Sequence, residues 1–200
     1  MKAVRGIVGT CVPIDRSDID TDQIIPASWL KRVERTGFGV GLFSAWRESD
    51  PDFALNRPEY AGANILIAGP NFGVGSSREH AVWALTDYGF QAVISSRFGD
   101  IFRNNATKTG LVPVVVSPEF ATALMRAVEA DPALIVEIDV AERWISAPTI
   151  GLAESFPLDD FTRNRLVEGL DDIGLTLRHA DKITAYEQSR PPWMPRIATA

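Results

Sequence analysis

The first candidate site is a short segment, residues 71–81, with the sequence NFGVGSSREHA. Its two glycines, Gly73 and Gly75, would let the backbone approach a bound ligand closely. Arg78 carries a planar guanidinium group that can hold a carboxylate through two parallel hydrogen bonds. A helical pattern follows directly, and the free amide groups at a helix N-terminus attract anions. The segment therefore predicts a binding site for a small carboxylate or phosphate.

Glycine-containing segments also bind nucleotides, but this one lacks the required patterns. Arg78 stands where the third glycine of a dinucleotide-binding turn belongs, and its side chain would intrude between helix and strand. No Gly-Lys-Ser/Thr sequence follows, so the segment is not a P-loop. A structural role stays open, because Ser76 and Glu79 have the spacing of a helix capping box. Such a box would contribute about 1 kcal/mol and would occupy the Ser76 hydroxyl group.

A second polar cluster, DIDTD at residues 18–22, places carboxylates at alternate positions. Calcium-binding loops share this alternation, but they need a glycine at the sixth position and a glutamate at the twelfth. Gln23 and Trp29 stand at those positions, so we do not expect a calcium site. A solvated turn before a helix and the polar wall of an active site both fit the pattern.

The composition limits the class of protein. The 200 residues are 46% hydrophobic and 23% charged, as in a soluble globular protein with one substantial core. A net charge of −6 argues against a nucleic-acid partner. Cys11 is the only cysteine, which excludes an internal disulfide and an iron–sulfur cluster held by this chain alone. The N-terminal residues resemble neither a membrane span nor a signal peptide, so we expect a cytoplasmic protein.

Hydrophobic periodicity predicts an α/β fold. Apolar strand patterns alternate with helical patterns in the middle of the chain, which indicates a parallel sheet with right-handed crossovers. The expected strands are 64–68, 90–94 and 111–116, and the expected helices are 81–88, 100–109 and 118–130.

The flanking regions complete the expected domain. Residues 3–14 predict one strand, and residues 27–60 a long structured loop with short helical pieces. An antiparallel pair is expected over 134–145, and helices over 158–170 and 181–188. We expect a single domain over 1–200, in which residues 190–200 form a loose or partner-contacting extension because their prolines prevent a regular helix.

Several motif blocks resemble one known family. The glycine segment, extended to NFGVGSSREHAVWAL, is followed in order by DYGF, FGDIF, NN and GLVPV. Upstream, residues 18–47 read DIDTDQIIPASWLKRVERTGFGVGLFSAWR. These blocks resemble the small subunits of 3-isopropylmalate dehydratase, which correspond to the swivelling domain of the aconitase superfamily. The resemblance covers most of residues 1–120 and implies a β/β/α domain, a mixed sheet with parallel βαβ units.

The resemblance implies a hydro-lyase of leucine biosynthesis that interconverts 2-isopropylmalate and 3-isopropylmalate by loss and return of water. The iron would belong to a [4Fe-4S] cluster on a separate large subunit, so this chain would bind no metal and would be active only with that subunit. By position in the family motif, Ser76 would be the catalytic base, and Ser77 and Arg78 would bind the substrate carboxylate. The residues that would support this active site are Asp20, Thr21, Asp22, Gly73 and Gly75.

Residues 29–37 correspond to the family's substrate-recognition loop. Cations in this loop would balance a dianionic substrate, and apolar side chains would contact its isopropyl group. The candidates are Lys31, Arg32 and Arg35 for the charges, with Arg35 favoured over Lys31, and Leu30 and Val33 for the isopropyl group. A solvated basic loop is the alternative, because lysine and arginine are mostly exposed in proteins.

Two other functions stay open from the sequence. One is the small subunit of a related hydro-lyase acting on homoaconitate or on a methyl-substituted malate or maleate. The other is a stand-alone protein that binds a dicarboxylate. Among the remaining side chains, we expect His80 to pack on its helix instead of binding a metal. We expect Trp83 and Trp144 in the core, and Trp193 at an interface between subunits.

Overall fold

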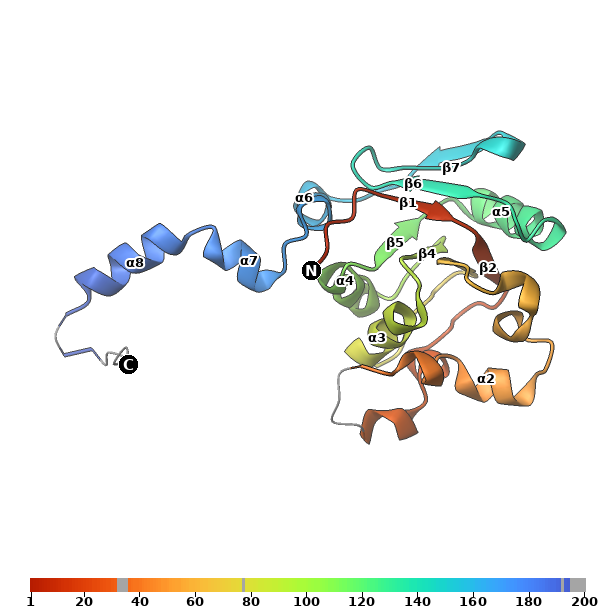
Figure 1. Cartoon of the computed structure of the whole chain (residues 1–200), viewed down its shortest axis with the longest axis horizontal. Coiled ribbons are helices and arrows are strands. Elements are labelled where there is room, and N and C mark those ends of the chain that lie inside the picture. The colour runs from red at the N-terminus through yellow and green to blue at the C-terminus, as the bar shows by residue number, and fades with distance from the viewer. Residues whose placement is uncertain (32–35, 77, 192, 195–200) are drawn as a thin grey trace.

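The strands of the protein form two four-stranded sheets, one parallel and one antiparallel, as Figure 1 shows. The structure is a computed structural model, which describes residues 1–31, 36–76, 78–191 and 193–194. Helices pack against the parallel sheet, and the predicted α/β class with parallel βαβ units is confirmed. The antiparallel strands form a sheet of their own.

The parallel sheet has the strand order β2-β3-β4-β5. Its strands are β2 (Cys11–Ile14), β3 (Ile65–Ala68), β4 (Ala92–Ser95) and β5 (Val112–Val115). Almost every residue in them is buried, which is typical of a sheet covered on both faces and explains the continuous apolar runs. Pro13 and Pro113 lie in the two edge strands, the position in a sheet where proline is tolerated.

Three helices cover the parallel sheet. α3 (Glu79–Tyr88) and α4 (Asp100–Thr109) pack together on one face, whereas α5 (Pro118–Ala130) contacts β2, β3 and β4 as well as the second sheet (Figure 1). The bounds of α4 and α5 agree with the prediction. Local chemistry explains this agreement: Ser117 caps α5 ahead of Pro118, and Gly110 ends α4 in a left-handed conformation.

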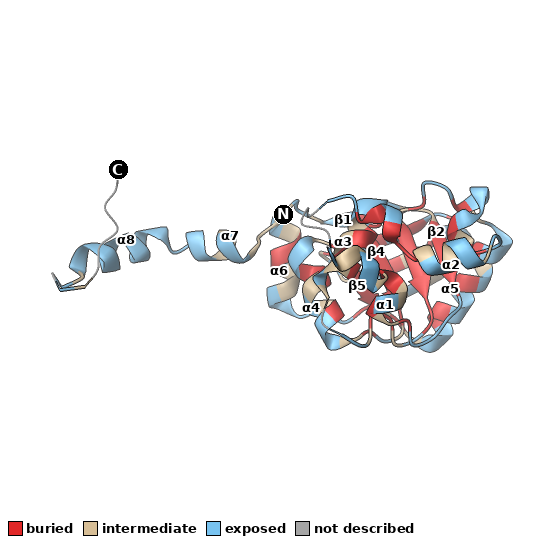
Figure 2. Cartoon of the chain, turned by 90° about the horizontal axis from the view of Figure 1, so that it is seen from below, coloured by how far each residue is buried: buried red, intermediate tan, exposed pale blue. Residues whose placement is uncertain are grey.

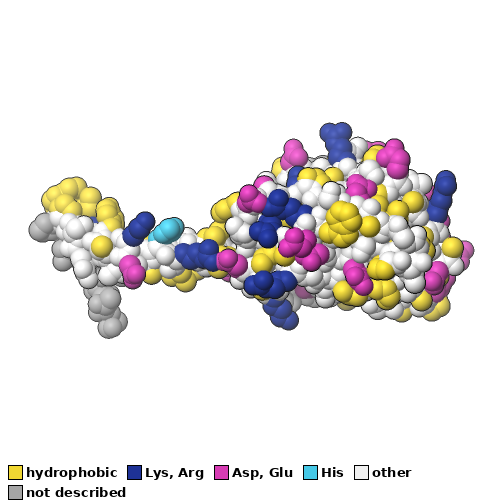
Figure 3. Space-filling view, turned by 90° about the horizontal axis from the view of Figure 1, so that it is seen from above, with side chains coloured by type: hydrophobic (Ala, Val, Ile, Leu, Met, Phe, Trp, Pro, Cys, Tyr) yellow, Lys and Arg dark blue, Asp and Glu magenta, His cyan; other side chains and the backbone are white. Residues whose placement is uncertain are grey.

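The antiparallel sheet has the order β1-β6-β7-β8. Its strands are β1 (Gly6–Gly9), β6 (Val136–Asp139), β7 (Trp144–Ala147) and β8 (Leu152–Ser155). Figure 3 shows the molecule from above, and basic, acidic and apolar side chains are interspersed on that face. Trp144 is expected in the core, and this prediction is wrong, because the residue is 46% exposed. It alternates along β7 with buried Ile145 and pairs with exposed Asp139 of β6, so it faces solvent.

Two other predictions of strands and helices are corrected by the structure. Residues 3–14 do not form one strand, because β1 pairs with β6 and β2 pairs with β3. The alternating burial of β1 and the complete burial of β2 reflect these different sheets. Strand β8 and helix α7 (Asp172–Leu177) were absent from the prediction, and both are short segments with few buried residues.

The region between β2 and β3 has the predicted short helical pieces. They are two α-helices and four 3₁₀ turns, the latter labelled η: α1 (Thr21–Ile24), η1 (Ala27–Lys31), η2 (Gly39–Gly41), α2 (Ser44–Ser49), η3 (Ala54–Asn56) and η4 (Pro58–Tyr60). Outside this region, a further 3₁₀ turn, η5 (Pro148–Ile150), precedes β8. Buried aromatic side chains hold this region on the sheet, among them Phe38, Phe43 and Phe53. In the described part of this region the helical pieces are short because of its glycine and proline content, and not for lack of packing.

The C-terminal helices leave the body of the molecule. α6 (Asp160–Glu168) packs beside α4, but α7 and α8 (Ala180–Ser189) extend away from both sheets (Figures 1 and 2). Every residue of α8 is exposed, and Trp193 beyond it is 77% exposed. Only 190–191 and 193–194 of the predicted C-terminal extension belong to the described residues. No helix in the described part of the chain is both long and apolar enough to cross a membrane.

Candidate functional site

The candidate residues gather where three connecting segments follow the parallel strands. The segment after β2 pairs with the glycine segment after β3 through a parallel bridge between Asp20 and Val74. The glycine segment pairs in turn with the segment after β4 through Phe72 and Phe98. Ligands of open α/β sheets bind at the carboxyl ends of the strands, and these bridges place the candidates there.

Both glycines of the glycine segment adopt backbone conformations that other residues avoid. Gly73 has a φ of +73°, and a Cβ atom on it would lie 2.3 Å from Cγ of buried Phe102. Its N–H group donates to the carbonyl oxygen of Ile19 at 2.7 Å. Gly75 has a φ of +89° and lies close to Asp20, with 3.4 Å between a built Cβ atom and the Asp20 Cβ atom. The glycines therefore serve the close packing of the segment against its neighbours.

We predict that Gly73→Ala destabilises the protein by more than about 2 kcal/mol. Alanine is disfavoured in the left-handed backbone conformation of Gly73, and its Cβ atom would also clash with the Phe102 ring. Gly62→Ala is the matched control: Gly62 has a φ of +81° but no atom within 4 Å of a built Cβ atom. This control should lose only about 1 kcal/mol. Chemical denaturation of both variants measures the difference, and equal losses would contradict the close contact with Phe102.

Ser76 does not cap the following helix, so the capping box that the sequence left open as an alternative does not form. α3 begins at Glu79, and its N-cap residue is Arg78, which has an extended backbone and makes no side-chain capping bond. The Thr21 hydroxyl group donates to the Ser76 carbonyl oxygen at 3.1 Å and so ties the glycine segment to α1. Ser76 itself is exposed, and within the described residues its Oγ atom has no hydrogen-bond partner. Its hydroxyl group is therefore available to a ligand.

Thr21 is 2% exposed and is the described side chain that holds Ser76. We predict that Thr21→Val lowers stability by about 1 kcal/mol and turnover on the order of ten-fold, since one hydrogen bond and the placement of Ser76 are lost. Thr21→Ser keeps the hydroxyl group and should retain most of the activity. Thermal denaturation and steady-state kinetics of the two variants separate these effects. A Thr21→Val enzyme with normal turnover would contradict the role of this contact.

Arg78 forms an ion pair with Asp22, whose carboxylate accepts from Nη1 of the guanidinium group. The two side chains are 20% and 50% exposed, so solvent screens the pair and its net contribution to stability is small. The pair instead fixes the direction of the Arg78 side chain, which has several further N–H donors. Those donors, together with the helix N-terminus beside them, suit an anionic ligand.

The acidic segment is ordered by its own hydrogen bonds. Asp20 caps α1 by accepting from the Gln23 N–H group at 2.7 Å, and the Gln23 side chain accepts from the Asp20 N–H group at 2.9 Å. Asp18 accepts from the Asn71 side chain at 2.7 Å. These contacts assign Asp20 a capping role, whereas Asp22 faces the candidate site through Arg78.

The structure brings together seven of the predicted site residues. They are Asp20, Thr21, Asp22, Gly73, Gly75, Ser76 and Arg78. Leu30 and Lys31 lie in η1, and within the described residues neither forms a hydrogen bond or ion pair with the glycine segment. Four predicted residues lie outside the described residues: Arg32, Val33, Arg35 and Ser77.

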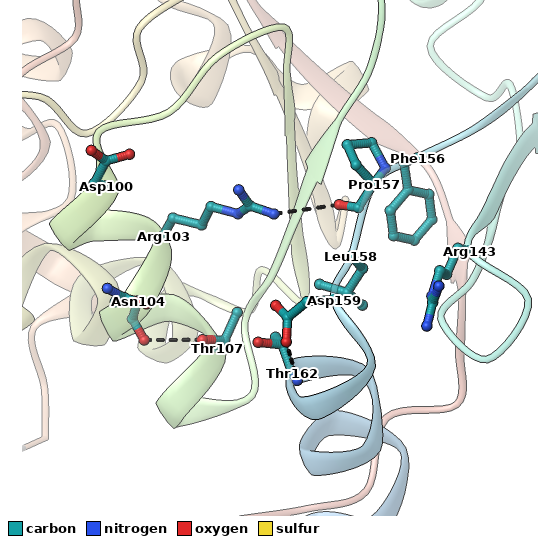
Figure 4. Close-up of a pocket in the computed structure, with 10 residues that line it drawn as sticks. All are labelled: Asp100, Arg103, Asn104, Thr107, Arg143, Phe156, Pro157, Leu158, Asp159 and Thr162. Atoms are coloured by element: carbon teal, nitrogen blue, oxygen red, sulfur yellow. Dashed lines mark hydrogen bonds between the residues drawn. The ribbon is translucent and has the colours of Figure 1, made fainter.

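A cavity of about 650 Å³ lies elsewhere, between α4 and the segment that leads into α6 (Figure 4). Arg103 reaches across it from α4 and donates to the Pro157 carbonyl oxygen at 3.4 Å. Asp159 caps α6, and the hydrogen bond from the Thr162 N–H group lowers the pKa of its carboxyl group. Because Arg103 and Asp159 already bond to the fold and no predicted site residue lines the cavity, it is a weaker candidate than the glycine segment. No sequence motif indicated it.

The donor groups of this chain do not fit an iron–sulfur cluster. Cys11 is completely buried in β2, and burial raises the pKa of its thiol group, which opposes the thiolate form that binds metals. In the described part of the chain, no three His, Cys, Asp or Glu side chains are grouped to hold a metal ion. His80 packs against the rings of Phe38 and Trp83, as predicted, with centroid distances of 5.3 and 4.7 Å.

Known proteins share both this sequence and this fold. A family model of the aconitase C-terminal domain matches residues 1–119, and a model of the C-terminal domain of the 3-isopropylmalate dehydratase small subunit matches residues 172–200. The 3-isopropylmalate dehydratase small subunit of Parafrankia sp. (strain EAN1pec) is 60% identical over 198 residues, covering 99% of this chain and 100% of that one. The chain belongs to the 3-isopropylmalate dehydratase small-subunit family.

Two further relatives support the family and its fold. The 3-isopropylmalate dehydratase small subunit of Acidothermus cellulolyticus is 62% identical over 187 residues, 94% of this chain and 93% of that one. The crystal structure of a 3-isopropylmalate dehydratase from Methanocaldococcus jannaschii has a TM-score of 0.67 at 28% identity, covering 90% of this chain and 99% of that chain. Because the Parafrankia and Acidothermus relatives are named small subunits of a dehydratase, the family acts within a complex.

Proposed function

We propose that this protein, together with a large subunit, interconverts 2-isopropylmalate and 3-isopropylmalate by loss and return of water, in the cytoplasm and in leucine biosynthesis. The single observation that carries this proposal is the juxtaposition of an oriented arginine with a serine hydroxyl group that bonds to no described residue. Ser76 and Arg78 lie two residues apart at the start of α3, held by Thr21 and Asp22 from another segment.

Arg78 binds a carboxylate of the substrate in this proposal. Its pairing with Asp22 fixes the guanidinium group and leaves other N–H donors for a bidentate contact. The N-terminal amide groups of α3, which no described side chain caps, add a favourable potential for the anion. Ser77 supplies a second contact to the same carboxylate by its position in the motif.

Ser76 takes and returns the proton at the carbon beside that carboxylate. An alkoxide on Ser76 would be stabilised by the helix N-terminus and by the positive charge of Arg78, both of which follow it in the chain. General base catalysis requires a side chain within hydrogen-bonding reach of the proton. Ser76 is exposed, and its hydroxyl group bonds to none of the described residues, which supports this role better than a capping position would.

The recognition loop, residues 29–37, contacts the remainder of the substrate. Lys31, Arg32 and Arg35 balance its second negative charge, with Arg35 the foremost of them. Leu30 and Val33 contact the isopropyl group. The names of the curated relatives do not favour a homoaconitase or a methyl-substituted malate hydratase, nor a stand-alone binding protein.

The [4Fe-4S] cluster belongs to the large subunit in this proposal, because the buried Cys11 cannot serve as its ligand. The two chains form a heterodimeric unit in which residues 1–200 of the small subunit are a single domain of the aconitase swivelling type. The exposed Trp193 contacts the partner in this proposal, as does the C-terminal extension over 190–200.

A reconstitution experiment tests the proposal. Turnover of 2-isopropylmalate is measured for the isolated chain, for a cluster-loaded large subunit, and for the two together. We expect activity only in the mixture. Activity of the isolated chain, or an inactive mixture whose subunits associate, would refute the proposal that this chain supplies the base and the large subunit the cluster.

A further inference from the structure

The segment that directly follows the recognition loop packs along α3, from His80 near its start to Asp87 near its end. The ring of Phe38 is completely buried, with centroid distances of 5.3 Å to His80 and 5.8 Å to Trp83. Its backbone N–H group donates to Oδ2 of Asp87 at 3.0 Å. One helix therefore carries Arg78 at its start and, through Asp87 near its end, holds the chain just after the recognition loop.

Gly39 extends this contact through close backbone packing. A Cβ atom on Gly39 would lie 2.8 Å from the backbone nitrogen of Tyr88 and 2.9 Å from the carbonyl carbon of Asp87. These are backbone atoms of a helix, so they cannot rotate away as a flexible side chain would. Only glycine at this position lets η2 approach α3 so closely.

The other end of the loop is held by an aromatic side chain. A Cβ atom on Gly41 would lie 2.5 Å from the Trp29 ring, so the indole packs directly on the backbone of η2. Trp29 begins the recognition loop, and Gly41 lies just beyond its end. The two ends of the loop therefore meet at η2, and η2 in turn is fixed to α3 by Gly39 and Phe38.

The charge of Asp87 has an unfavourable position for the helix itself. A carboxylate in the last turn of a helix opposes the negative end of the helix dipole. Aspartate is also a weaker helix former than alanine. The hydrogen bond to the Phe38 N–H group is the described interaction that compensates for these costs. Asp87 therefore serves to hold the segment after the recognition loop more than to stabilise α3.

We propose that Asp87 and Gly39 are positioning residues, which hold the chain directly after the recognition loop on α3 and so fix the point from which the loop extends relative to Arg78. Asp87 lies nine residues after Arg78, which corresponds to about 14 Å along the axis of α3. This positioning role rests on the proposed function, because the loop and the glycine segment must bind opposite parts of one substrate. Neither residue touches the substrate, so their loss affects affinity more than the chemical step.

Kinetics of the reconstituted two-subunit enzyme test this role with three variants. Asp87→Ala removes the acceptor, and we expect KM for 2-isopropylmalate to rise about ten-fold while kcat stays within about two-fold, as for the loss of one charge-assisted hydrogen bond. Asp87→Asn keeps an acceptor oxygen and should restore KM to near the wild-type value. Gly39→Ala should raise KM at least as much as Asp87→Ala. Asp52→Ala, at an exposed aspartate on another surface, is the control.

Hydrogen exchange at the Phe38 amide provides a readout that does not depend on activity. Protection should fall in Asp87→Ala and persist in Asp87→Asn. An unchanged KM, a loss in kcat alone, an Asp87→Asn variant as impaired as Asp87→Ala, or unchanged exchange would each overturn the positioning role. An inactive wild-type complex would instead refute the proposed function, and the exchange measurement would still decide whether Asp87 holds Phe38.

Discussion

Replacing Ser76 by alanine is expected to lower kcat of the two-subunit enzyme about a hundred- to ten-thousand-fold, because the proposed base is removed. The Ser76 side chain makes no hydrogen bond within the described part of the chain, so its loss should not change the fold. KM and the affinity for the large subunit should therefore remain close to their wild-type values. Steady-state kinetics and gel filtration of the complex measure these quantities.

Ser155→Ala is the matched control for this prediction, because Ser155 is an exposed serine in β8 of the other sheet. It should leave kcat unchanged. If the Ser76→Ala complex assembled and turned over normally, Ser76 would not be the base, and the neighbouring Ser77 would be the next residue to replace. A loss of assembly in Ser76→Ala would show a structural role that the contacts of Ser76 do not indicate.

Arg78→Lys is expected to lower kcat/KM about ten- to a hundred-fold, although the positive charge is kept. Lysine cannot form the planar two-bond contact with a carboxylate, and one charge-assisted hydrogen bond contributes about 1.5–3 kcal/mol. Lysine also pairs less rigidly with Asp22, whose contact orients the guanidinium group. The loss should appear in the affinity for a dicarboxylate inhibitor, which calorimetry measures separately from turnover.

Arg126→Lys provides the control, because Arg126 is exposed on α5, which packs on the opposite face of the parallel sheet from α3. Asp22→Asn distinguishes orientation from direct binding: it keeps an acceptor for Arg78 but removes the charge, so its effect should be smaller than that of Arg78→Lys. Wild-type inhibitor affinity in Arg78→Lys would place Arg78 outside the binding site.

The sequence by itself determined the features that depend on neighbouring residues. The bounds of α4 and α5 could be predicted because Gly110, Ser117 and Pro118 act locally at helix ends. The glycine segment was recognisable for a similar reason, since residues with special backbone and charge properties are concentrated in a few positions. Several motifs in one order also indicated the family, which the relatives confirm.

The tertiary structure decided the features that depend on distant residues. α3 begins at Glu79 and not near Ser76, and the Ser76 carbonyl group instead accepts a hydrogen bond from Thr21, 55 residues away. The pairing of Asp22 with Arg78 and the outward direction of Trp144 likewise follow from how strands are arranged. A capping pattern describes only what the local chain favours. The choice between a capping serine and an unengaged one required a hydrogen bond from another segment, which no local spacing encodes.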